Sequence, residues 1–228
     1  RTYSVLDFVR AQESSDLRRF IFCARINSPD ESLRFFARCR NENSASGVTG
    51  LLLVYRRYVV HLLESPEAEI FEICSCFVEA EHRCLGASKC FPVQTNVEER
   101  FFDKWQARRV AGDCENVKNC EDEFVENLDN VKEIYCKLVD DLYAFCDDLR
   151  ASRAINRVYF MDKLEALASE KDSRLPEVST LEAILQSPWG ESLDNFMRDY
   201  NRGISSADVE DVIWPFPTSP CPAIDTIK

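Results

Sequence analysis

The sequence predicts an α+β fold in which a mostly antiparallel sheet carries helices on one face and is followed by a helical extension. Over residues 18–110, short apolar runs alternate with segments of helical spacing in the order β-α-β-β-α-β. That order is typical of the ferredoxin-like arrangement. Beyond residue 112 the spacing becomes helical alone, and 228 residues are enough for one small domain plus an extension.

The first half of the predicted sheet follows from local residue types. Residues 18–26 are rich in β-branched and aromatic types, which favour a strand. A helix start signal follows at residues 27–30, and we expect a helix over about residues 30–41. Two apolar runs, 48–54 and 58–64, are separated by three residues and predict a hairpin.

For the second half of the sheet, the sequence predicts a helix, a strand and a last segment with two possible assignments. Residues 66–80 have helical spacing, with Pro66 suited to the first turn and one apolar face made by Ile70, Ile73 and Phe77. Residues 84–94 predict another strand. Residues 100–110 fit either the last strand or the approach to it.

A heptad stripe begins the predicted extension. Apolar residues recur at alternating steps of four and three: Phe124, Leu128, Val131, Tyr135, Leu138, Leu142, Phe145 and Leu149. The helix over this stripe should be about 40 Å long. We expect the stripe to be fully buried, and the part that outruns the sheet to pack on residues 155–200 or on a partner chain in a coiled coil.

These patterns divide the chain into three parts. We expect the sheet domain at residues 15–112 and a helical extension at residues 113–200, with further short helices after the heptad stripe. Residues 201–228 contain four prolines together with Trp214 and Phe216, and predict an extended docking tail.

Composition bounds the class of protein. A formal net charge of −12 argues against nucleic acid or an anionic membrane as the main partner. No apolar run approaches the roughly 20 residues of a membrane span. The 11 cysteines are odd in number and mostly fall within periodic apolar segments, which predicts reduced thiols in a cytoplasmic protein.

Motifs for catalysis or metal binding are missing from the sequence. The histidines are His61 and His82, and neither lies in a nucleophile pattern. The cysteines lack paired zinc-site spacing, and the six glycines form neither a dinucleotide-binding fingerprint nor a phosphate-binding loop. We therefore expect no metal site and no enzymatic activity.

Three stretches of the first half carry a resemblance to a known family. They are Gly47-Val48-Thr49-Gly50-Leu51-Leu52-Leu53, then Tyr58-Val59-Val60-His61-Leu62-Leu63-Glu64, and finally Arg100-Phe101-Phe102-Asp103-Lys104-Trp105. Together they resemble the signature of BLUF domains, a family of blue-light-sensing flavin domains. The resemblance covers roughly residues 18–110 and implies a site for FAD between the two helices, against the sheet.

The resemblance assigns four positions to that flavin site. The family's electron-donating tyrosine is replaced here by Phe22, and its glutamine by His61. A phenyl ring has no hydroxyl, and an imidazole cannot reproduce the paired carbonyl and amino groups of an amide. Asn43 matches the asparagine that binds the flavin ring, and Trp105 matches a mobile tryptophan. We therefore expect the photochemistry to be lost, and no bound cofactor, with FAD as the alternative.

Each of these positions also has a structural interpretation. Phe22 is then a core aromatic residue, and His61 a hydrogen-bonded histidine in the core. Asn43 serves a turn before a strand, and Trp105 packs on the sheet.

The second half resembles one branch of the family. Residues 175–185, which begin Leu-Pro-Glu, and the tail at residues 212–217 are similar to a testis-expressed, BLUF-like family of ciliated eukaryotes. This implies a structural or interaction module in a multi-subunit ciliary or flagellar complex of the axoneme, with neither nucleic acid nor membrane as partner. The alternative is an FAD-binding sensor of blue light or redox state.

Overall fold

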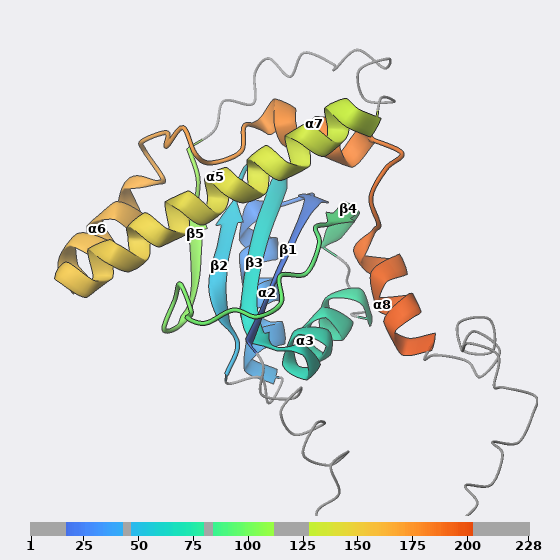
Figure 1. Ribbon diagram of the computed structural model, residues 1–228, viewed down its shortest axis with the longest axis horizontal. Coiled ribbons are helices and arrows are strands. Elements are labelled where there is room, and N and C mark those ends of the chain that lie inside the picture. Colours follow the sequence, from blue (N-terminus) through green and yellow to red (C-terminus); the bar gives the residue numbers. More distant parts are fainter. Residues whose placement is uncertain (1–16, 43–46, 80–83, 112–127, 203–228) are drawn as a thin grey trace, which may run out of the picture.

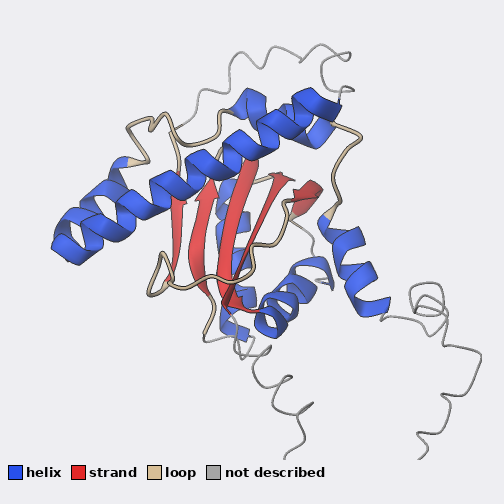
Figure 2. Ribbon diagram, in the orientation of Figure 1, coloured by secondary structure: helices blue, strands red, loops and turns tan. Residues whose placement is uncertain are grey.

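The computed structural model describes residues 17–42, 47–79, 84–111 and 128–202. Figures 1 and 2 show one sheet with helices on both of its faces. The order of strands in space is β4-β1-β3-β2-β5. Among the described residues, none of the helices is long and apolar enough to cross a membrane.

The sheet confirms the predicted ferredoxin-like arrangement. Its strands are β1 (Leu17–Ile26), β2 (Thr49–Val54), β3 (Tyr58–Pro66), β4 (Leu85–Cys90) and β5 (Trp105–Arg109). Neighbouring strands are antiparallel except β5, which runs parallel to β2. The predicted hairpin is present as β2 and β3, with Leu52 opposite His61.

Two helices cover one face of the sheet. They are α2 (Pro29–Glu42) and α3 (Glu67–Glu79), so Pro66 ends β3 instead of lying in the first turn of a helix. The predicted apolar face of α3, made by Ile70, Ile73 and Phe77, is buried. These residues form the first core together with Phe35 and Phe36 of α2 and with the strand residues that face them, among them Phe20, Phe22, Leu52, Val59 and Leu63.

Helix α5 (Leu128–Ile155) crosses the opposite face of the sheet. Four residues of the predicted stripe are buried there, namely Leu138, Leu142, Phe145 and Leu149, and Val131 is buried as well. The prediction of a fully buried stripe is wrong at its start, because Leu128 is 50% exposed and Tyr135 is half-buried. A helix of 28 residues is longer than a five-stranded sheet is wide, so its first turn lies past the strands (Figure 1). Phe124 lies outside the described residues.

Two short helices pack against α5 and complete the second core. They are α6 (Arg157–Ala166) and α7 (Val178–Gln186), and they bury Phe160, Leu164, Leu181 and Ile184 against the sheet and α5. Part of α5 therefore packs on residues 155–200, which is one of the two expected arrangements.

A buried carboxylate fixes α7 to the sheet. Glu182 is 8% exposed and accepts hydrogen bonds from Arg25 at the end of β1 and from Tyr58 at the start of β3. Gln186, one turn further along α7, donates to the same carboxylate at 2.9 Å. A buried carboxylate needs such partners, so this contact specifies where α7 lies.

Helix α8 (Leu193–Arg202) lies on the other side, against α3 and β4. Leu193 and Met197 enter the first core, and Phe196 stacks on Phe20 with 4.8 Å between ring centroids. The backbone N–H of Leu193 donates to Ser88 of β4 at 3.0 Å. The extension thus covers both faces of the sheet.

A substitution at Gly50 tests the register of the hairpin formed by β2 and β3. Gly50 has φ +139, and a Cβ there would lie 2.0 Å from the carbonyl oxygen of Leu62. We expect Gly50→Ala to lower the free energy of unfolding by on the order of 3 kcal/mol. The control is Gly86→Ala in β4, where the nearest atom is 3.5 Å away and the change should stay within about 0.5 kcal/mol. Urea denaturation followed by circular dichroism measures both, and equal midpoints would contradict the register.

Candidate functional site

The central strands bring His61 and Phe22 together, as the resemblance requires. Phe22 on β1 lies directly opposite His61 on β3, and both side chains face the layer formed by α2 and α3. The two rings meet edge to face with 5.4 Å between centroids. Both residues are 0% exposed, so this position lies at the centre of the first core.

Trp105 on β5 completes a hydrogen bond at the same position. Its indole Nε1 donates to Nε2 of His61 at 2.8 Å. Because the indole can only donate, Nε2 must be the acceptor, and the imidazole proton of the neutral ring lies on Nδ1. That Nδ1 atom is buried and has no hydrogen-bond partner among the described residues. Burial lowers the pKa of His61 to about 3, so the ring is neutral at physiological pH.

Phenylalanine rings fill the space beside His61. Phe36 of α2 and Phe77 of α3 lie 5.1 and 5.7 Å from His61 between ring centroids, and 4.8 Å from each other. Both are 1% exposed. The resemblance implies a flavin between these two helices and the sheet. A tricyclic flavin ring would have to displace Phe36 and Phe77, so the residues here do not fit that group.

Three of the four positions predicted for the site lie within the described residues, and the fourth does not. Phe22, His61 and Trp105 come together in one cluster of contacts. Trp105 is half-buried, and the guanidinium carbon of Arg40 lies 5.7 Å from its ring centroid. Asn43 lies outside the described residues. In the described ranges, no group of three or more His, Cys, Asp or Glu side chains could hold a metal ion.

Sequence reasoning missed the role of Glu64. Its side chain is 0% exposed and accepts hydrogen bonds from the guanidinium Nε of Arg19 at 2.9 Å and from the backbone N–H groups of Phe101 and Phe102 at 2.8 and 3.1 Å. Arg100 donates to the backbone oxygen of Glu64 at 2.6 Å. The signal in the sequence is a carboxylate near the end of a mostly apolar strand.

The same network joins the sheet to α5. The guanidinium carbon of Arg19 lies 3.5 Å from the ring centroid of Phe101 and 5.7 Å from that of Tyr143 on α5. Arg19 also donates to the backbone oxygen of Glu99 at 2.6 Å. These contacts position the segment that precedes β5 and so bring Trp105 to His61.

Fold and site together define a class: a ferredoxin-like sheet protein whose space between the two helices is filled by aromatic side chains around a buried histidine. The chain belongs to the testis-expressed protein 47 family, whose model matches residues 17–202. The membership predicted from the second half of the sequence is thereby confirmed. No curated protein matches the chain.

Solved structures similar to this chain are BLUF proteins and light-regulated enzymes. BlrB, a BLUF protein in its dark state, is 19% identical with a TM-score of 0.36 over 42% of this chain and 74% of its own. BlsA in its photo-activated state is 15% identical with a TM-score of 0.34 over 69% and 98%. A bacterial light-regulated adenylyl cyclase is 17% identical with a TM-score of 0.35 over 41% and 27%, so this chain spans about a quarter of the cyclase.

The neutral state of His61 predicts a pH dependence of stability. The unfolded chain binds a proton at this residue below pH 6.5, whereas the folded chain does not until about pH 3. Stability from this residue is therefore complete above pH 6.5 and is lost as the pH falls from 6.5 toward 3. Between pH 7.5 and 5.5 the loss should be about 1.4 kcal/mol.

The matched control is His61→Gln, which keeps an acceptor for Trp105 and removes the titration. The wild-type chain should lose about 1.4 kcal/mol more than the variant over that pH range, by urea denaturation at each pH. A variant with the same pH dependence as the wild type would contradict a buried neutral histidine.

Removal of the Glu64 charge should be costly. Glu64→Gln places an amide where every neighbour donates and leaves the Arg19 guanidinium buried without its counter-ion, at a cost of about 3–5 kcal/mol in unfolding free energy. The control is Glu67→Gln, whose ion pair with Arg18 is more exposed and should matter by less than about 1 kcal/mol. Thermal or urea unfolding compares the two, and similar losses would disprove the assignment.

Proposed function

We propose that this chain is a structural or interaction protein without flavin photochemistry, and that it works in a multi-subunit ciliary or flagellar assembly. The observation that carries the proposal is the ring cluster around His61, which takes the space where the resemblance implies a cofactor. Phe22, Phe36 and Phe77 are each buried to 1% exposure or less. Rings packed in this way stabilise the fold by about 1.5–3 kcal/mol each, in place of a ligand.

The polar groups at this position support the loss of photochemistry. Phe22 has no hydroxyl from which an electron and a proton could leave together. His61 is held by one hydrogen bond to Trp105 and presents no amide that could rotate. A ring that is neutral, buried and surrounded by phenylalanines suits a permanent core better than a light-driven switch.

The helices beyond the sheet support an interaction role. Helices α5, α6 and α7 cover one face, and α8 packs beside α3. Within the described residues, the exposed large apolar side chains all lie in this second half, among them Ile155, Val158 and Tyr159. The net charge of −12 favours a protein partner over nucleic acid. Expression in testis, which the family name states, is compatible with a sperm flagellum.

The experiment for the cofactor is a flavin titration of the purified full chain. We expect the protein expressed with excess riboflavin to carry far less than one flavin per chain, and added FAD to leave its visible spectrum and melting temperature unchanged. One flavin per chain, with a reversible red shift of its absorbance under blue light, would overturn the proposal in favour of a sensor.

Two variants distinguish the loss of the photochemical side chains from the lack of space for a flavin. Phe22→Tyr with His61→Gln restores both photochemical side chains, yet we expect no flavin binding because Phe36 and Phe77 still occupy the space. Phe77→Ala opens that space and should lower the unfolding free energy by about 3–5 kcal/mol. If the first variant alone bound FAD, the rings would not be what excludes it.

The assembly is tested in ciliated cells. We expect a tagged full chain to remain with axonemes after detergent extraction, and to leave them when high salt dissociates peripheral proteins. Complete release by detergent alone would contradict a place in the axoneme and would leave the flavin result unaffected.

A further inference from the structure

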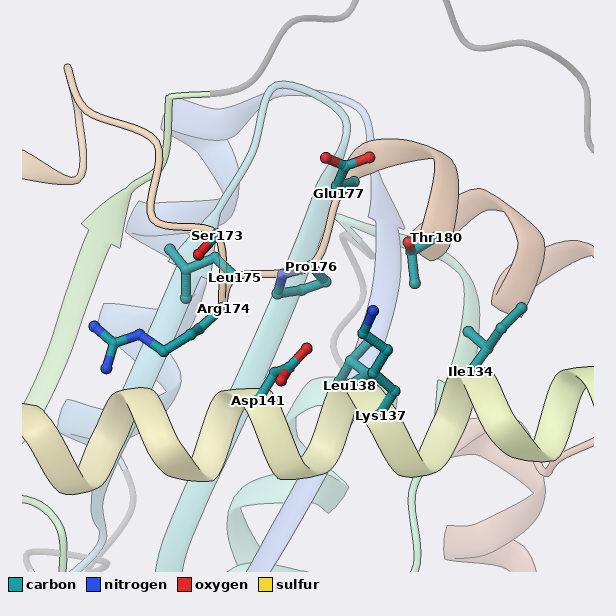
Figure 3. A pocket seen from close by; sticks show the side chains of 10 residues that line it. All are labelled: Ile134, Lys137, Leu138, Asp141, Ser173, Arg174, Leu175, Pro176, Glu177 and Thr180. Atoms are coloured by element: carbon teal, nitrogen blue, oxygen red, sulfur yellow. The ribbon is translucent and has the colours of Figure 1, made fainter.

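A groove lies beside α5, on the side that carries Leu138. It lies between α5 and residues 173–180, which join α6 to α7 and begin α7, and it encloses about 330 Å³. Its floor is apolar, because Leu138 and Leu175 meet there beside the buried Pro176. Figure 3 shows the side chains of Lys137 and Asp141 rising from α5 toward Pro176.

Two of the four charged side chains that line this groove are paired with neighbours. Arg174 is bound by Asp148 at 3.3 Å and by Asp172 at 2.7 Å. Glu177 is paired with Lys171 at 2.7 Å. These pairs hold the wall of the groove in place and leave little net charge on it.

Lys137 and Asp141 differ from Arg174 and Glu177 in that neither forms an ion pair with another described residue. Within the described ranges no ion pair or hydrogen bond joins either of them to another side chain. They lie four residues apart on one helix face, but an acid that follows its base is the weaker order for such a pair. After the hydrogen bond from Lys171, the Lys137 ammonium helps to hold the pKa of the Glu177 carboxyl below its usual value, but it forms no ion pair with it. Asp141 therefore offers its charge to whatever enters the groove, and Lys137 offers the part of its charge that Glu177 does not offset.

We propose that this groove docks a segment of a partner protein that places one apolar side chain on the floor, an acidic group opposite Lys137 and a basic group opposite Asp141. The inference rests on the proposed interaction role. The volume lies at the lower end of the range for ligand pockets and has room for an anchoring side chain, as at the centre of many protein interfaces. Because Lys137 and Asp141 lie about 6 Å apart along α5, the partner must present its two charges in opposite order at that spacing.

The charges should set specificity more than affinity. Exposed ion pairs contribute little net binding energy, but like charges in the wrong order repel. A segment with the two charges reversed should therefore be rejected even when its apolar residue fits.

The test uses a display library of random short peptides selected on the immobilised full chain. We expect enriched peptides to share an apolar residue flanked by an acid and a base in one order. On the double variant Lys137→Glu, Asp141→Lys, the enriched order should invert, and peptides selected on the wild type should bind the variant roughly tenfold more weakly. Equal melting temperatures of the two proteins would confirm that the fold is unchanged.

A second variant blocks the groove without touching its charges. Ser173 is exposed at the wall, and Ser173→Trp should abolish enrichment of the same peptides. No enrichment on the wild type, or enrichment that neither variant changes, would overturn the proposal. If the double variant still assembles normally in axonemes, the groove is not the docking site, while the broader interaction role stands.

Discussion

The buried carboxylate of Glu64 is the contact on which the rest of this structure depends. It lies near the end of β3, where it meets the guanidinium of Arg19 from β1 and two backbone N–H groups from the segment before β5. A charge removed from water at this depth is tolerated only when its hydrogen-bonding capacity is met from several sides. Three separate segments of the chain must therefore pack together around this carboxylate, and their packing determines where β5 can pair.

The sheet that results is covered on both faces. Every residue of β2 is buried, and so are eight of the nine residues of β3. Alternate side chains of these strands enter two cores: Phe22, Leu52 and His61 point toward α2 and α3, while Leu51, Val60 and Leu62 point toward α5. This explains why the apolar runs of the sequence are continuous here instead of alternating with polar residues.

Much of this arrangement could be predicted from local patterns. The hairpin, the helices α2 and α3, and the orientation of His61 with Val59 and Leu63 follow from spacing along short stretches of chain. The prediction of burial is wrong at Leu128 because a heptad pattern does not report where the sheet beneath it ends. Leu128 continues the pattern, although it has passed beyond the strands.

The site was less predictable, since it depends on pairings distant in sequence. Phe22 and His61 could be placed from the family resemblance, but the bond from Trp105 to His61 requires β5 to lie parallel to β2. That Phe36 and Phe77 occupy the intervening space follows from side-chain volumes on two separate helices. The partners of Glu64 come from β1, β2 and the residues before β5, and no local pattern joins them.

The two-sided sheet has a consequence for how the protein is made. Strands β1 to β5 leave the ribosome first, and the face that carries Leu51, Val60 and Leu62 has no cover until α5, α6 and α7 have been synthesised. At about 5–20 residues per second, that apolar face stays uncovered for several seconds. During synthesis the chain therefore passes through a stage in which one whole face of its sheet is open to aggregation.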